Sequence, residues 1–307
     1  MSSARTLFLS RITSLIKSLG IEAVAPRPLT DQAHNDVARM LRNGLAVVGF
    51  AALEDFLKSR TSEVLADVGR TSVPFRDLPE KLRYATTFEA IDALSYQMSL
   101  RPRADRVSYI QEHAQKIAST SSAAYELTPH ALGFDQANLQ DETIKSILKC
   151  FLIENPWGEM TRLASRLGLA ALPLDETYRS AATRRHRAAH VAHADIPQAD
   201  LVQFTKEALA IAIGFDALLT RALAMIQAHD QRYLLGTTKV TAASIVVRSI
   251  THSDARWREH VEGRATAVKV ESTSDALVTA ARTRAIAAKN LLVIHSIGSA
   301  HVSWECY

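Results

Sequence analysis

The sequence is poor in residues that cross-link or interrupt a fold. Its 307 residues include 2 cysteines, 11 glycines and 9 prolines. Cys150 and Cys306 are far apart and lack the paired spacing of a zinc site. This scarcity of cysteine argues against a disulfide scaffold and favours a reducing compartment. Few glycines and prolines beside abundant alanine and leucine favour helices.

Long apolar runs and targeting segments are also missing. No apolar run reaches the roughly 18–20 residues of a membrane span. The apolar residues 7–9 are followed by Arg11 and Lys17 and by no small-residue cleavage site, so a signal peptide is not expected. We therefore expect a soluble, cytoplasmic protein.

The chain has enough apolar material for a sizeable core. Hydrophobic residues make up 47% of it, which predicts one large or two ordinary domains and argues against wholesale disorder. The net charge of +4 is mildly basic. Such a charge is compatible with a nucleic-acid partner but does not require one.

Apolar spacing predicts a mainly α fold in three parts. Residues 1–29 form an amphipathic helix and a linker, residues 30–235 a helical bundle, and residues 236–307 a small α/β module. A long helix should begin at Thr30 as its N-cap and end near Gly69. The helix over 201–233 is apolar around most of its circumference and should be central. Shorter helices are expected over 82–98, 107–117, 141–151, 160–169 and 174–193.

The C-terminal module should follow a ββαββ order and be distinct from the bundle. Short β-branched segments at 244–250 and 265–270 precede an alanine-rich helix at 275–289. Two further strands are predicted at 291–297 and 300–304, with a hairpin turn at Gly298–Ser299. The basic residues of this module alternate with acidic ones, which predicts a mixed surface. Residues 119–122 and 128–133 should form exposed loop.

The densest polar group in the chain lies at residues 184–193. Three arginines and three histidines occur there without an acidic residue: Arg184, Arg185, His186, Arg187, His190 and His193. Cleavage of RNA by its own 2′-hydroxyl needs only a proton acceptor or donor and a cation for the phosphorane oxygens. Histidine titrates near neutral pH, and arginine binds phosphate through paired hydrogen bonds. Arg185 and His190 supply this combination, and His186 can bind or position a phosphate.

The pattern R-x4-H formed by Arg185 and His190 resembles the signature motif of the HEPN superfamily. The RiboL-PSP branch is the most similar. Its long early helix is matched by residues 51–57, its Asn-Pro-aromatic turn by Asn155-Pro156-Trp157, and its closing helix by residues 201–233. The resemblance covers roughly residues 30–233. The chain departs from the pattern at His186, where asparagine is frequent, and at Val191, where glycine is frequent.

The resemblance implies a metal-independent endoribonuclease that needs no cofactor. Such enzymes are helical bundles, and their products are a 2′,3′-cyclic phosphate and a 5′-hydroxyl. The resemblance also implies a homodimer with a composite active site, a role as a toxin or anti-phage effector, and an antitoxin or defence-system partner. We assign Arg185 and His190 as catalytic. His186, Arg184 and His193 are supporting candidates, and Glu54 is a candidate for holding an arginine of the motif.

Several alternatives remain open from the sequence. The cluster can be a solvated basic end of a helix, or the bundle can bind RNA or protein without cutting. The motif register can instead pair Arg184 with His190 or Arg187 with His193. If the helix runs through residue 193, the histidines at 186, 190 and 193 share one face near Asp195 and resemble a zinc site. We expect Trp157 to be a packing anchor, and His34, His113, His130 and His229 to lie on the surface.

Overall fold

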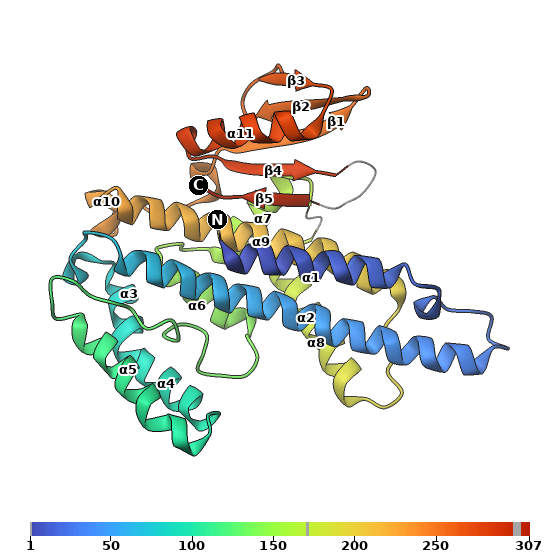
Figure 1. Ribbon diagram of the computed structural model, residues 1–307, viewed down its shortest axis with the longest axis horizontal. Coiled ribbons are helices and arrows are strands. Elements are labelled where there is room, and N and C mark those ends of the chain that lie inside the picture. Colours follow the sequence, from blue (N-terminus) through green and yellow to red (C-terminus); the bar gives the residue numbers. More distant parts are fainter. Residues whose placement is uncertain (1, 170–171, 297–301) are drawn as a thin grey trace.

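A computed structural model describes residues 2–169, 172–296 and 302–307. The protein is mainly helical and carries a mixed sheet in its C-terminal part. In Figure 1 the sheet lies above two long neighbouring helices, and several of the shorter helices extend below them. The predicted mainly α fold with a small C-terminal α/β part is therefore confirmed.

The centre of the bundle is built from three helices. These are α1 (Ser3–Leu19), α2 (Gln32–Gly69) and α9 (Gln198–Gln227), and they pack side by side. Helix α9 buries residues on nearly all of its faces, as its all-round apolar pattern predicts. Gly49 lets α1 and α9 pack closely against α2, because a Cβ at this position would lie 2.9 Å from Leu15 of α1 and 3.1 Å from Phe204 of α9.

Helix α9 also corrects an expectation about apolar length. Within the described ranges it is the one helix long and apolar enough to cross a membrane by length and composition. In the protein, 89% of its most apolar window is buried against other elements. The core helices of soluble proteins have the same composition.

Two helix starts differ from the predictions. Helix α2 begins after Asp31 rather than Thr30, because the Asp31 carboxylate accepts the backbone N–H of His34 at 3.4 Å. The predicted turn at 155–158 is wrong. Asn155 is the N-cap of α7 (Pro156–Arg166), and Pro156 occupies the first turn, where its missing N–H costs nothing.

The predicted helix over 82–98 divides into three pieces. These are α3 (Glu80–Tyr84), a π-helical turn (Ala85–Glu89) and α4 (Ala90–Ser99). The hydroxyls of Thr86 and Thr87 donate to the carbonyls of Leu82 and Arg83 at 2.7 Å each. Such back-bonding competes with the helical ladder and accompanies the wider turn.

The remaining helices of the bundle are α5 (Arg106–Ser119), α6 (Asp141–Cys150), α8 (Leu174–His190) and α10 (Gln231–Leu234).

The exposed loop predicted after α5 is confirmed only in part: residues 121–122 are exposed, but residue 128 and residues 131–133 are buried. Tyr125, Leu127 and Leu132 are buried in the main core. Two histidines that were expected on the surface are involved: His130 belongs to this segment, and His113 of α5 packs against it. His113 is buried beside Thr128, and His130 is half-buried beside Tyr109.

The sheet has one strand more than the predicted ββαββ order. Its strands are β1 (Val247–Ser253), β2 (Arg256–Val261), β3 (Lys269–Glu271), β4 (Leu291–His295) and β5 (Val302–Glu305), with α11 (Ser274–Ala288) before β4. The spatial order is β3-β2-β1-β4-β5; β1 and β4 are parallel and the other pairs antiparallel. Strand β2 is polar and charged, so its sequence lacks the apolar alternation of a strand. The predicted turn at Gly298–Ser299 lies outside the described residues.

The sheet shares the core of the bundle instead of forming a distinct appendage. The Trp304 ring of β5 lies edge-on to Phe8 of α1 and Phe56 of α2, with centroids 6.2 and 6.0 Å apart. Its indole N–H donates to Asp216 of α9 at 2.8 Å. The mixed surface predicted for the module is confirmed in part by the ion pairs Arg258–Asp254 and Lys269–Glu271. Arg248 and Glu259 form a buried ion pair instead.

Candidate functional site

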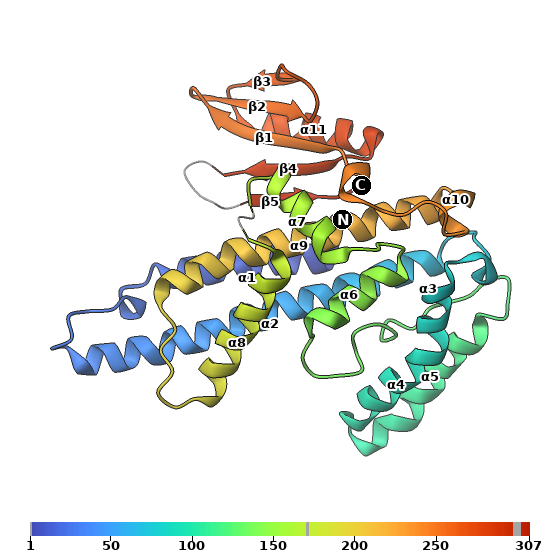
Figure 2. The ribbon, with the colours of Figure 1, turned by 180° about the vertical axis from the view of Figure 1, so that it is seen from behind.

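Helix α8 carries the cationic cluster in its last two turns. Its first half is anchored by Tyr178, whose hydroxyl donates to the carbonyl of Leu139 at 2.8 Å and whose ring packs on Phe50 of α2. Trp157 also packs on Tyr178, with ring centroids 5.7 Å apart, and its indole N–H donates to the carbonyl of Asp141, so the predicted packing anchor is confirmed. Figure 2 shows α8 leaving this anchored region and turning into the connection to α9. The basic residues therefore lie on a supported but solvent-reaching helix end.

The structure brings two histidines of the cluster together. His186 and His190 are one turn apart on α8, their ring centroids are 4.8 Å apart, and both residues are exposed. Two imidazoles at this separation can contact neighbouring oxygens of one phosphodiester. The same position also suits a plain structural role, since cations in the last turn of a helix interact favourably with its C-terminal carbonyls.

Arg185 is held by a neighbour that the sequence analysis did not single out. Its Nη2 donates to Oδ1 of Asn138 at 3.1 Å, and its Nε is buried without a hydrogen-bond partner among the described residues. Asn138 is 47 positions away in the sequence and belongs to no motif. Only the folded arrangement of the segment before α6 could have identified it.

Glu54 contacts the segment that carries Asn138. It is buried on α2, and its carboxylate accepts the backbone N–H of Leu139 at 2.7 Å. Burial raises the pKa of Glu54, while the Leu139 N–H and the positive charge of Arg185 oppose that rise. Glu54 therefore supports Arg185 through the 138–139 segment and through its field, and no direct ion pair joins the two residues among those that the structure describes.

The other basic candidates have separate environments. Arg184 points towards α9 and forms an ion pair with Glu207 at 3.3 Å. Arg187 is exposed on α8, and His193 is exposed in the connection between α8 and α9. This connection is fastened to α2, because Arg42 donates to Asp195 at 2.6 Å and Asn43 donates to the carbonyl of Ala194 at 2.8 Å.

Arg185 and His190 leave α8 in different directions. Five residues of an α-helix correspond to a rotation of about 140°. Among the described contacts, Arg185 is bonded to Asn138, whereas His190 faces His186. Within one chain, the arginine and the histidine of the motif therefore do not form a directly bonded pair.

The zinc alternative requires a helix that continues to residue 193. Helix α8 ends at His190, so His193 does not share the face of His186 and His190. Asp195 is engaged by Arg42. No group of three or more His, Cys, Asp or Glu side chains placed for a metal ion occurs in the ranges 2–169, 172–296 and 302–307.

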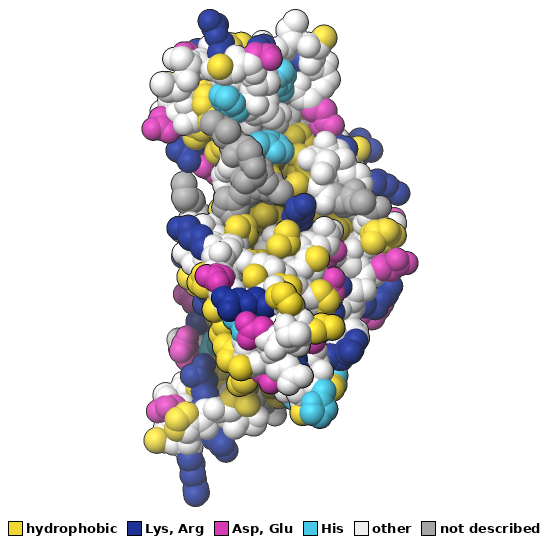
Figure 3. All heavy atoms as spheres, turned by 90° about the vertical axis from the view of Figure 1, so that its right-hand side faces the viewer, with side chains coloured by type: hydrophobic (Ala, Val, Ile, Leu, Met, Phe, Trp, Pro, Cys, Tyr) yellow, Lys and Arg dark blue, Asp and Glu magenta, His cyan; other side chains and the backbone are white. Residues whose placement is uncertain are grey.

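Basic side chains do not form one continuous surface at the end of the molecule seen in Figure 3. Dark blue lysine and arginine side chains there are interspersed with acidic and apolar ones. An electrostatic attraction to nucleic acid would therefore be local rather than spread over this whole face.

The chain matches no protein-family model, no curated protein and no solved structure. The likeness to the HEPN superfamily consequently rests on the residues of the motif and its surroundings.

Proposed function

We propose that the protein is a metal-independent endoribonuclease of HEPN type with its active site at the end of α8. The observation that carries this proposal is the exposed imidazole pair of His186 and His190, 4.8 Å apart, beside an arginine that Asn138 orients. Imidazoles can transfer the protons and a guanidinium can supply the positive charge that cleavage by the 2′-hydroxyl needs, so no cofactor takes part in the proposed reaction.

The chemistry follows from the two proton transfers of the reaction. One imidazole, assigned to His190, accepts the proton of the 2′-hydroxyl while the 2′-oxygen forms a bond to phosphorus. The bond from phosphorus to the 5′-oxygen breaks, and His186 in its protonated form donates a proton to that oxygen. Arg185 stabilises the negative oxygens of the phosphorane. The products are a 2′,3′-cyclic phosphate and a 5′-hydroxyl.

A second copy of the chain would complete the site. The rotation of about 140° between Arg185 and His190 on one helix is bridged when one subunit supplies the arginine and the other the histidine. An exposed apolar stripe on the first half of α2 offers a surface for such a dimer: Val37, Met40, Leu41 and Val48, with Met40 74% exposed. Arg42 and Asn43, in the same half of α2, donate hydrogen bonds to the connection between α8 and α9 that follows the motif.

The test is cleavage of total RNA in EDTA by the native protein, by Arg185→Ala and by His190→Ala. Both variants should be folded and should lose cleavage. Mixing the two inactive variants should restore about one quarter of native activity if each site of a two-fold dimer combines residues from both subunits. Absence of cleavage by the native protein would overturn the nuclease, whereas full loss without recovery on mixing would overturn only the composite site.

A non-catalytic module that binds RNA or protein is the competing function. The divergent directions of Arg185 and His190 favour it, because exposed cations alone suffice for phosphate contacts. Binding of RNA by the native protein, without cleavage in EDTA or in Mg²⁺, would establish this alternative.

The cellular role that we propose is that of a toxin or anti-phage effector in the cytoplasm. An unrestrained ribonuclease damages its own host, so such a protein needs an antitoxin or a defence-system partner. This part of the proposal rests on the HEPN resemblance.

A further inference from the structure

A second polar site lies where both ends of the described chain meet the bundle. A cavity of about 660 Å³ is lined there by the start of α1, the second half of α2, α11 and the residues after β5. This volume is within the range of small-molecule sites, roughly 300–1,000 Å³. The residues that matter to its chemistry are Arg5, Arg60, Glu63, Ala66, Arg282 and Glu305.

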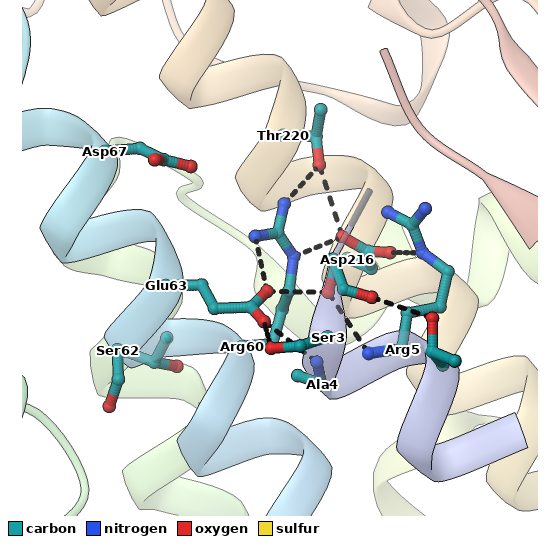
Figure 4. A network of polar contacts seen from close by, with 12 residues as sticks. Ser3, Ala4, Arg5, Arg60, Ser62, Glu63, Asp67, Asp216 and Thr220 are labelled. Carbon is teal, nitrogen blue, oxygen red and sulfur yellow. Dashed lines mark hydrogen bonds and ion pairs between the residues drawn. The ribbon is translucent and has the colours of Figure 1, made fainter. Parts of the chain in front are cut away.

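The floor of the cavity is a buried ion network, drawn in Figure 4. Asp216 of α9 is fully buried and accepts from Nε of Arg5 at 2.8 Å and from Nε of Arg60 at 2.7 Å. Arg60 also donates through its terminal nitrogens, to Glu63 at 3.3 Å and to Thr220 at 2.9 Å. All three nitrogens of the Arg60 guanidinium are therefore used.

The acidic groups around the cavity are also occupied. Glu63 accepts the backbone N–H of Ala4 at 2.8 Å and the hydroxyls of Ser2 and Ser3. Glu305 accepts from Arg282 and from the hydroxyl of Tyr307. These carboxylates are therefore already compensated and do not need a further cation.

Arg5 is the member of this network whose hydrogen-bond donors are not all used by the described residues. Its side chain is only 6% exposed, yet only Nε is hydrogen-bonded among the described contacts. Figure 4 shows both terminal nitrogens of Arg5 without a partner. The two terminal nitrogens of a guanidinium have the spacing of a carboxylate or phosphate edge, so they can hold such a group through paired hydrogen bonds.

We propose that this cavity binds a small organic anion whose carboxylate or phosphate group is held by the terminal nitrogens of Arg5. Ala66 and the side chain of Ile286 provide apolar surface for the body of the ligand. Arg282 also lines the cavity, where its charge is paired with Glu305. The proposal is independent of the ribonuclease activity.

The experiment is calorimetric titration of the full chain with phenyl phosphate, benzoate and inorganic phosphate. The first two probes carry an apolar body and distinguish phosphate from carboxylate recognition. Arg5→Lys keeps the charge but loses the paired donors, so binding should weaken by about tenfold or more. The control is Arg11→Gln. Arg11 is on α1 like Arg5, but its side chain forms an exposed ion pair with Asp55 of α2, so this variant should bind the probes like the native protein.

A second variant covers the case in which Arg5→Lys does not fold. Ala66 is exposed to the cavity, so Ala66→Phe fills the space without removing a polar partner and should abolish binding. Loss of binding in Ala66→Phe, with Arg11→Gln unaffected, supports the site. Failure of all three probes to bind the native protein, or equal binding by Ala66→Phe, overturns it.

Discussion

The rings of His186 and His190 lie one helical turn apart, with centroids separated by 4.8 Å and planes inclined by 47°. This relationship follows directly from the i, i+4 spacing, because residues four apart share a face of an α-helix. The pair is exposed and lies at the C-terminal end of α8. The two imidazoles are therefore both open to solvent and fixed relative to each other.

The first prediction concerns this pair. His186→Ala and His190→Ala should each lower the cleavage rate by about 10²–10⁴-fold, the usual contribution of a positioned acid or base. The double variant should be little worse than the more affected single variant, because the two groups act in one step. Cleavage rates measured with a fluorescent RNA check this, with His193→Ala as the control outside α8. A loss in His193→Ala equal to that in His190→Ala would contradict the assignment.

The second prediction concerns the positioning of Arg185 by Asn138. Asn138→Ala removes the acceptor at 3.1 Å and should lower kcat by about 10- to 100-fold, since a lost hydrogen bond to a charged group corresponds to about 1.5–3 kcal/mol. KM should change less, because the arginine remains present. Asn138→Asp keeps an acceptor oxygen and should restore most of the rate.

Gln136→Ala is the matched control for that series. Gln136 lies in the same segment but donates to Thr143 instead of contacting Arg185. Steady-state kinetics of the three variants distinguish positioning from a general loosening of the segment. Equal losses in Asn138→Ala and Gln136→Ala would indicate loosening only.

The third prediction concerns the stability contributed by Asp216. Asp216→Asn preserves the shape but leaves Arg5 and Arg60 without their shared counter-charge. The free energy of unfolding should fall by about 3–5 kcal/mol, the range for breaking a buried ion pair. Thr220→Val removes the hydrogen bond accepted from Arg60 and the one donated to Asp216. It should cost about 1.5–3 kcal/mol, less than Asp216→Asn, because the buried charges stay paired. Urea unfolding followed by circular dichroism measures both, and similar small losses would show that the network contributes little.

The fourth prediction is a pH dependence of stability. Burial lowers the pKa of His130 from 6.5 to about 4, and repulsion from His113, Arg101 and Lys116 acts in the same direction. The unfolded chain therefore binds more protons than the folded chain between these two pH values. The stability contributed by neutral His130 is present above pH 6.5 and is lost as the pH falls towards 4.

Urea unfolding at pH 7, 5.5 and 4.5 tests this dependence. His130→Gln cannot titrate there, so its stability should decline less steeply than that of the native protein over the same interval. Parallel declines in the two proteins would assign the acid sensitivity to other groups, His113 among them, whose pKa is also lowered by burial.

Much of the helical fold could be predicted from the sequence. The all-round apolar pattern of α9 predicted the centre of the bundle, because burial imposes the period of a helix on apolar residues. The apolar stripe predicted along α2 is buried only in its second half, from Ala52 to Val64. In its first half Val37, Met40, Leu41 and Val48 are exposed. The start of α7 was missed because Asn155-Pro156 favours both a turn and a helix N-terminus. Strand β2 was missed because its pairing with β1 and β3, rather than its charged sequence, determines its conformation.

The site could be predicted only in its local part. The spacing of His186 and His190 is visible in the sequence, and so is the density of arginines. The roles of Asn138 and Glu54 depend on the segment before α6 passing between α2 and α8. The burial of Trp304 against Phe8 and Phe56 likewise joins the two ends of the chain. Such contacts depend on tertiary packing, which local residue patterns do not encode.

The most direct measurement is the chemical nature of the ends produced from a defined RNA oligonucleotide in EDTA. The native protein should leave a 2′,3′-cyclic phosphate and a 5′-hydroxyl, and an oligonucleotide lacking the 2′-hydroxyl at the cleavage site should remain intact. Arg185→Ala and His190→Ala should leave both oligonucleotides intact. Products with 5′-phosphate ends, cleavage of the 2′-deoxy substrate, or no cleavage by the native protein would contradict a 2′-hydroxyl mechanism at the end of α8.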